Sequence, residues 1–148
     1  MSGSEGVQGG KDSALAQPKQ CLNVVVLRKA KKEGHEFLNP GQYEHMTGVI
    51  KRLVDFNSPM EITDLRIEPI ESFYELKDKG GLLGKINVRI YFAYVPDEGN
   101  IVVLKAYKKE EEGKVPRHVV ITVLARLRSY LKDGACAGAT IYKADVSL

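Results

Sequence analysis

The clearest alternation of hydrophobic and polar positions lies between Ile86 and Val95. Its hydrophobic residues occupy every second position, at Ile86, Val88, Ile90 and Phe92. Successive side chains of a strand point to opposite faces of a sheet, so the pattern predicts a strand that carries Arg89 and Tyr91 on its second face. A turn sequence, PDEGN, follows, and the apolar run at 101–109 predicts the returning strand of an antiparallel hairpin.

Shorter hydrophobic runs predict further strands on both sides of this hairpin. The β-branched run in LNVVVLRKAKK, which begins near Leu22, predicts the first strand. Apolar residues between Ile62 and Tyr74 are also typical of a strand, but Pro69 interrupts them and favours an edge strand or a bend. Residues 73–76 continue as a strand, and the C-terminal ATIYKADVSL is compatible with one more.

Two segments show the three- and four-residue spacing of a helix. In NPGQYEHMTGVIKRLVDF, Asn39 is a suitable cap and Pro40 suits the first turn. The apolar stripe of this helix comprises Met46, Val49, Ile50, Leu53 and Val54. The second helix begins at Pro116 and ends near Asp133. Its apolar stripe comprises Val120, Val123, Leu124, Leu127 and Leu131.

The predicted order is a strand, a helix, a run of antiparallel strands and a second helix, with a candidate strand at the C-terminus. Strands grouped along the chain are typical of an α+β domain. We therefore expect an α+β fold with an antiparallel or mixed β-sheet, whose helices pack on one face and leave the other open. Residues 1–20 lack an apolar period and are expected to be a disordered tail. Residues 21–133 would form the domain, and 134–148 a C-terminal extension.

The composition of the chain limits the number of domains, the cofactors and the location that we expect. The chain has 148 residues, 43% of them hydrophobic, and a formal net charge of +3, which suits one domain with a mild basic bias. Its three histidines and two cysteines are scattered without metal-ligand or redox spacing, so we predict no metal and no cofactor. No segment approaches the roughly 18 consecutive apolar residues of a membrane span, and no secretory signal is visible. We therefore expect a cytoplasmic protein without a membrane partner.

Basic and tyrosine side chains collect on the second face of the predicted hairpin, at Arg89, Tyr91, Lys105, Tyr107 and Lys109. Arginine binds two phosphate oxygens at once, lysine adds charge, and tyrosine stacks on a splayed base. RNA carries its own nucleophile, the 2′-hydroxyl, so positioning and electrostatic stabilisation alone can promote cleavage of its backbone. The alternative is a half-solvated sheet surface on which these residues form only cross-strand pairs.

These segments resemble the RelE/ParE toxin superfamily, and specifically its HigB-like, phage-derived branch. The resemblance is carried by FYEL at 73–76, RIYF at 89–92, IVVLKAYKK at 101–109 and KVP at 114–116. Arg126 and Tyr130 fall where the last helix of the family often carries an arginine and a tyrosine. The resemblance extends from Leu65 to Leu131 and implies a RelE-like fold.

The resemblance also implies a function. Members of this kind are small toxins that cleave messenger RNA on the ribosome and are neutralised by a cognate antitoxin protein. It implies a catalytic set in which Arg89 contacts the phosphate, together with Lys105, Tyr107 and Lys109. Further RNA-binding residues are expected at Arg66, Lys85, Tyr91, Lys108, Lys114 and Arg126.

Other functions stay open at this point. Three glutamates, Glu110, Glu111 and Glu112, lie beside the proposed site and would repel RNA. They favour a non-catalytic RNA- or ribosome-binding member of the same fold. A ParE-like toxin that binds DNA gyrase is a second alternative, and an accessory protein that docks a partner along an exposed strand is a third.

Overall fold

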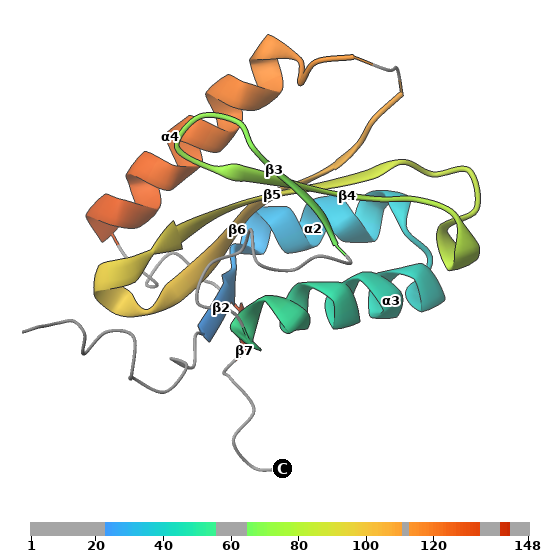
Figure 1. The fold of residues 1–148 in the computed structure, drawn as a ribbon, viewed down its shortest axis with the longest axis horizontal. Helices are drawn as coiled ribbons and strands as arrows, with labels where there is room; N and C mark the ends of the chain where they lie inside the picture. The colour runs from blue at the N-terminus through green and yellow to red at the C-terminus, as the bar shows by residue number, and fades with distance from the viewer. Residues whose placement is uncertain (1–22, 56–64, 111–112, 134–139, 143–148) are drawn as a thin grey trace, which may run out of the picture.

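A computed structural model describes residues 23–55, 65–110, 113–133 and 140–142 of the chain (Figure 1). It contains a six-stranded sheet in the order β3-β4-β5-β6-β2-β7. The strands are β2 (Asn23–Val26), β3 (Arg66–Pro69), β4 (Tyr74–Asp78), β5 (Val88–Val95), β6 (Asn100–Lys108) and β7 (Thr140–Tyr142). The helices are α2 (Arg28–Phe37), α3 (Pro40–Lys51) and α4 (Arg117–Asp133). Short 3-10 turns occupy Arg52–Asp55, Gly81–Leu83 and Pro96–Glu98.

The sheet is mixed because one of its pairings is parallel. Strands β3 to β6 form an antiparallel run, whereas β2 pairs with β6 in parallel, Val24 opposite Ile101 and Val26 opposite Val103. A parallel neighbour requires a crossover, and the chain from α2 to β5 supplies it. The α+β class and the mixed sheet expected from the sequence are thus confirmed.

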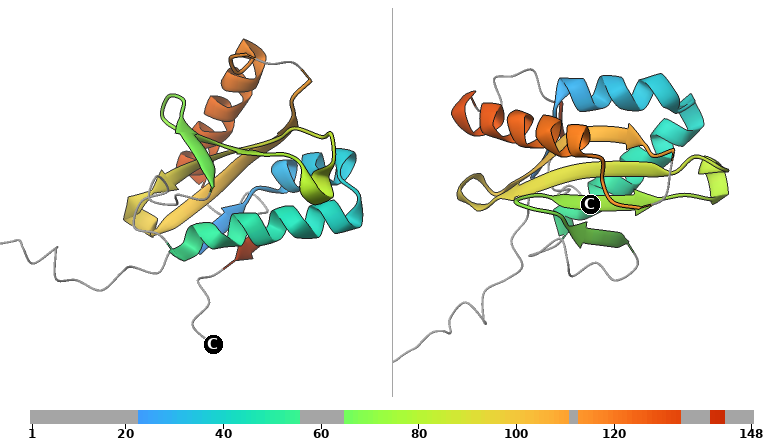
Figure 2. Two further views of the ribbon diagram at one scale, coloured as in Figure 1. Left: turned by 45° about the vertical axis from the view of Figure 1, so that its right-hand side comes forward. Right: turned by 90° about the horizontal axis from the view of Figure 1, so that it is seen from above.

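Helices cover both faces of this sheet (Figures 1 and 2). Two neighbouring residues of β6, whose side chains point to opposite faces, show which helices pack on each face. Ala106 borders a small cavity together with Ala30 of α2 and Met46 of α3. The ring of Tyr107, on the opposite face, lies edge-on to His118 of α4 with centroids 6.4 Å apart. The expectation that all helices share one face is therefore corrected: α2 and α3 pack on one face and α4 on the other.

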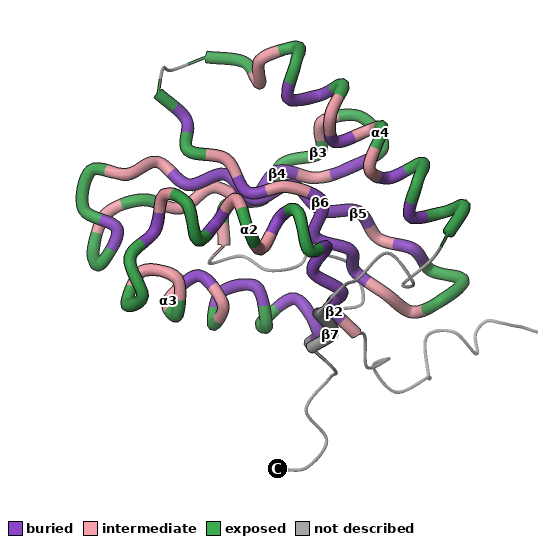
Figure 3. The backbone as a smooth tube through the Cα atoms, turned by 180° about the vertical axis from the view of Figure 1, so that it is seen from behind, coloured by how far each residue is buried: buried purple, intermediate pink, exposed green. Residues whose placement is uncertain are grey.

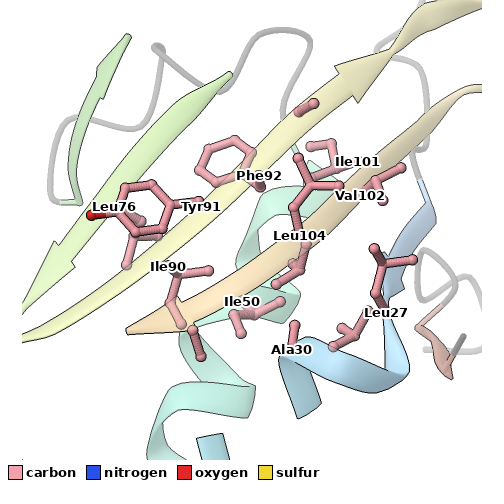
Figure 4. Close-up of a cluster of buried hydrophobic side chains, with 14 of the residues drawn as sticks. Leu27, Ala30, Ile50, Leu76, Ile90, Tyr91, Phe92, Ile101, Val102 and Leu104 are labelled. Carbon is pink, nitrogen blue, oxygen red and sulfur yellow. The ribbon is translucent and has the colours of Figure 1, made fainter. Parts of the chain in front are cut away.

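The central strands are buried because helices cover them on two sides (Figure 3). The core is one cluster of side chains from the sheet and the three helices, part of which is drawn in Figure 4. Its largest fully buried members are Tyr91, Tyr130, Phe73 and Phe92. A strand buried on both faces loses the simple alternation of hydrophobic and polar residues, so Arg89 and Tyr91 lie inside the protein rather than on an open surface.

The first strand is shorter than the sequence pattern predicts. It ends at Val26, and the basic run that was expected to continue it forms α2. Leu27, Ala30 and Gly34 are buried at three- and four-residue steps, which is helical spacing. The β-branched residues stop at Val26, and the Arg, Lys, Ala and Glu residues beyond it favour a helix.

Several other expectations are confirmed. Asn39 caps α3 with a complete capping box, in which its side chain and that of Gln42 each accept a hydrogen bond from the other's backbone N–H. Strand β3, which ends at Pro69, lies at the edge of the sheet. Strand β7 pairs antiparallel with β2 at the opposite side of the sheet. The proposed tail at residues 1–20 and the break at 57–59 lie outside the described residues.

The apolar stripe of α4 differs from the prediction at its C-terminal end. Tyr130 is 1% exposed, whereas Leu131 is 58% exposed. Both positions fit helical spacing from Leu127, by three and four residues. Tyr130 is the one that turns inward, and its hydroxyl is satisfied there because it donates to Glu98 at 2.7 Å and accepts from the Asn100 amide at 3.1 Å.

Candidate functional site

The candidate site lies where β4, β5 and β6 run side by side. Strand pairing places Tyr107 opposite Arg89 and Lys105 opposite Tyr91. On the other side of β5, Lys77 lies opposite Arg89, and Glu75 opposite Tyr91. Directly opposed residues of an antiparallel pair share a face. The structure thus brings together four of the predicted residues, and it adds two that the prediction left out, Glu75 and Lys77.

Arg89 is a buried cation with few hydrogen bonds. The residue is 8% exposed, and one guanidinium nitrogen, Nη1, donates to the Val88 carbonyl at 3.2 Å. Its Nε is buried without a hydrogen-bond partner, and the nearest carboxylate oxygen, on Glu75, is 3.9 Å away. An unsatisfied buried donor of this kind is costly and requires an explanation.

Glu75 is a buried carboxylate at 2% exposure, and it binds Tyr91. The Tyr91 hydroxyl donates to Glu75 at 2.8 Å. Burial, followed by the hydrogen bond and charge of Glu75, raises the pKa of Tyr91 far above its ordinary value. The ring of Tyr91 is fully buried and packs edge-on against Phe73, with centroids 5.9 Å apart. This placement leaves no ring face of Tyr91 for the base stacking that the sequence analysis expects.

A second carboxylate, Glu33 of α2, binds two of the predicted residues. Lys105 Nζ lies 2.7 Å from Glu33 Oε2, and Arg126 of α4 donates to both Glu33 oxygens at 2.8 and 2.9 Å. Burial alone would raise the pKa of Glu33, but hydrogen bonds and charge from Arg126 and Lys105 outweigh burial and lower it. Lys105 and Arg126 are therefore held by a carboxylate rather than presented to solvent.

Backbone groups of β6 complete the surroundings of Glu33. Strand β2 ends before the last part of β6, and Glu33 takes the place of a further strand residue by accepting a hydrogen bond from the Ala106 N–H at 3.2 Å. A register shift in the β5–β6 pairing leaves Leu104 without a partner across the hairpin. Arg126 donates to the Leu104 carbonyl at 2.9 Å. Arg126 thus stabilises a bulge in β6 as well as the charge of Glu33.

The remaining predicted residues divide into two groups. Tyr107 is half-buried, and Lys109 is 8% exposed with its ammonium donating to the Gly113 carbonyl. The exposed residues are Arg66, Lys85, Lys108 and Lys114. Among them Lys108 lies 3.7 Å from Glu110, so one of the glutamates beside the site offsets a predicted RNA-binding charge.

A groove adjoins the site between the β3–β4 hairpin and the start of α4. Its volume is about 690 Å³, and it is bordered by Glu75, Lys77, Lys114 and Arg117 among other residues. Lys77 forms an ion pair with Glu68 at 3.0 Å and lies 4.0 Å from Glu75. The groove forms between segments far apart in the chain, so no local sequence pattern predicts it.

Glu33, Glu75 and Lys77 are neighbours of the site that were not predicted from the sequence. Glu75 lies in the FYEL segment, at a position alternate with Lys77, so its face could have been read from the strand pattern. Glu33 follows a basic run that was assigned to a strand, and its partners lie 72 and 93 residues away. No local signal identifies such partners.

Two kinds of feature are not found in the described ranges. Within them, no three His, Cys, Asp or Glu side chains gather closely enough to hold a metal ion. No helix of this part of the chain is long and apolar enough to cross a bilayer.

Neither a comparison with models of protein families nor one with curated protein sequences finds a match for this chain. The resemblance to RelE/ParE toxins therefore stays a prediction that rests on the sequence segments named above.

Proposed function

We propose that this protein is a RelE/HigB-like toxin that acts as a ribosome-dependent mRNA endonuclease. The observation that carries the proposal is the Arg89 guanidinium, a buried fork of donors whose Nε has no hydrogen-bond partner. A phosphate oxygen is the acceptor that suits such a fork best, because the charged hydrogen bond is strong and two oxygens can be bound at once.

The placement of the sequence segments supports the proposal. FYEL, RIYF and IVVLKAYKK fall on or beside β4, β5 and β6, which are neighbours in the sheet, and KVP directly precedes α4. Segments that would form one site in a HigB-like protein are therefore adjacent in space. A cognate antitoxin partner follows from the same resemblance.

The proposed chemistry needs no metal. The RNA 2′-oxygen attacks the adjacent phosphorus to form a 2′,3′-cyclic phosphate, and the bond from phosphorus to the 5′-oxygen breaks. A general base takes the proton of the 2′-hydroxyl, and a general acid gives a proton to the leaving 5′-oxygen. Arg89 would stabilise the charge that grows on the phosphate. Tyr107, which lies opposite Arg89 in the pairing of β5 with β6, is half-buried. Lys108 and Lys114 supply positive charge at the surface. Since Arg89 is only 8% exposed, its guanidinium must turn outward to meet the RNA.

A second candidate function has its own support. Lys105 is bound by Glu33, and Tyr91 by Glu75, so two residues expected to act on RNA already serve the fold. This arrangement favours a non-catalytic RNA- or ribosome-binding protein, in which Arg89 and the exposed lysines bind a backbone without cleaving it. Such binding would weaken steeply as salt concentration rises.

The first prediction concerns Arg89→Ala. Inducible expression of the native chain in bacteria is expected to arrest growth and to create new 5′ ends within translated messages. Arg89→Ala is expected to reduce those ends by about a hundredfold or more, the effect typical of losing one charge-stabilising donor. The measurement is genome-wide mapping of 5′ ends beside a growth curve. Arg128→Ala, an exposed arginine of α4, is the matched control and should retain activity.

Two different results would contradict the proposed nuclease. Full activity of a folded Arg89→Ala variant, verified by circular dichroism and thermal melting, would refute the role of Arg89. Normal growth and intact messages, with salt-sensitive co-sedimentation of the protein with ribosomes, would establish the non-catalytic candidate instead.

A further inference from the structure

The groove beside Arg89 is bordered by both apolar and charged side chains. The apolar ones include Val120 of α4, which is buried, and the half-buried Ile70 and Val115. Apolar side chains of this kind accept the flat faces of a nucleobase, which stack on or pack against them when a base leaves its neighbours. The volume of about 690 Å³ is sufficient for a nucleotide.

Among the described carboxylates on the rim, Glu71 forms an ion pair but accepts no hydrogen bond. Glu75 is occupied by Tyr91, and Glu68 accepts a hydrogen bond from Lys77 at 3.0 Å. Glu71 differs, because its nearest cation, Arg117, is 3.7 Å away, longer than a hydrogen bond. Its side chain borders the groove and is 46% exposed, so the carboxylate is accessible to a ligand there.

The positive charges on the rim suit the phosphates on either side of such a base. Lys114 and Arg117 border the groove from the α4 side. Arg89 approaches it through Glu75, whose Oε2 lies 3.9 Å from Arg89 Nε. Among the described residues, three acidic and three basic side chains border the groove.

We infer that this groove is a nucleobase subsite that prefers guanine, with Glu71 as the residue that determines specificity. Guanine presents two adjacent donors, N1–H and the 2-amino group, which match the two oxygens of a carboxylate. Adenine and cytosine place an acceptor beside their amino group, and uracil has a single N–H between two carbonyls, so each leaves one Glu71 oxygen opposed or unpaired. The inference rests on the proposed function and names the base that lies beside the bound phosphate.

The test is a titration of ¹⁵N-labelled protein with the 5′-monophosphates of guanosine, inosine, adenosine, cytidine and uridine. Guanosine monophosphate is expected to bind most tightly and to shift the backbone amides of Glu71, Val115 and Arg117. Inosine monophosphate, which lacks the 2-amino group, should bind about tenfold more weakly, a difference typical of one lost member of a bidentate pair. Glu71→Gln should weaken guanosine monophosphate by about the same factor. Glu36→Gln, an exposed glutamate of α2, should not.

Each remaining outcome overturns the inference. Equal affinity for all five nucleotides, a guanine preference that survives Glu71→Gln, shifts away from the groove, or an absence of shifts would each do so. Failure of the inference is distinguishable from failure of the proposed function. If Arg89-dependent cleavage of messages persists without any guanine preference, the proposed function stands and the guanine subsite is wrong. If guanine binds specifically but messages are not cleaved, the subsite stands and the proposed nuclease function is wrong.

Discussion

The Tyr91 hydroxyl and the Glu75 carboxylate hold each other inside the sheet. A tyrosine on an open sheet face would be accessible to a ligand, but α4 covers this face, and the ring becomes part of the core. The cross-strand pairing of β4 with β5 sets the two residues opposite each other, so that each satisfies the polar group of its partner.

Tyr91→Phe tests this pair. The variant keeps the ring and leaves Glu75 buried without its donor, so the free energy of unfolding in urea should fall by about 1–3 kcal/mol at neutral pH. The pKa of Tyr91 is raised in the folded protein, so its contribution is present below the ordinary value of 10.0 and is lost as pH rises above it. The native protein should therefore lose more stability above pH 10 than Tyr91→Phe does. Tyr94→Phe, a half-buried tyrosine of the same strand, is the control, and an equal loss in both variants would contradict the assignment.

At the scale of elements, the features that the sequence predicts correctly are those that depend on residues close together in the chain. The capping of α3, the hairpin of β5 and β6 and the start of α4 depend on residues within a few positions of one another, and they were predicted. The predicted first strand is too long, because the local pattern does not separate Val24–Val26 from the basic run that follows. The burial of Ala30 and Gly34 in the structure shows that this run is helical.

Asn39→Ala tests the start of α3. Loss of the side chain leaves the Gln42 N–H without an acceptor and removes one half of the capping box, which should lower the free energy of unfolding by about 1 kcal/mol. Chemical denaturation at neutral pH measures the change. Glu44→Ala, an exposed residue inside the same helix, should change stability by much less; if the two variants lose the same amount, the cap does not contribute.

Across the whole molecule, Glu33 joins three elements that are distant in the chain. Its carboxylate binds Lys105 of β6 and Arg126 of α4 from a position on α2. It therefore holds helices on both sides of the sheet in a fixed relation to the candidate site. Both cations would be left partly buried without a counter-charge if it were removed.

Glu33→Gln is accordingly expected to lower the free energy of unfolding by roughly 2–4 kcal/mol at pH 7, since it leaves two cations uncompensated. The pKa of Glu33 is lowered in the folded protein, so its contribution is present above the ordinary value of 4.5 and is lost as pH falls through the lowered pKa. Urea titrations at neutral and at acidic pH should thus show the native protein and the variant converging as pH falls. A gap that stays constant with pH would contradict a charge-based role, and Glu36→Gln should behave as the native chain.

The sequence by itself determined the class of fold, the hairpin, the cap of α3, the start of α4 and the set of basic and tyrosine residues on one face of β5 and β6. These follow from periodicity and backbone preference, which act over a few residues. Only the tertiary structure decided the surroundings of that face. α4 covers it, Glu75 binds Tyr91, and Glu33 binds Lys105 and Arg126, whereas Arg89 keeps a buried donor without a partner. Among the described residues, these outcomes depend on contacts between segments as many as 93 residues apart, and no local pattern specifies which charges will meet.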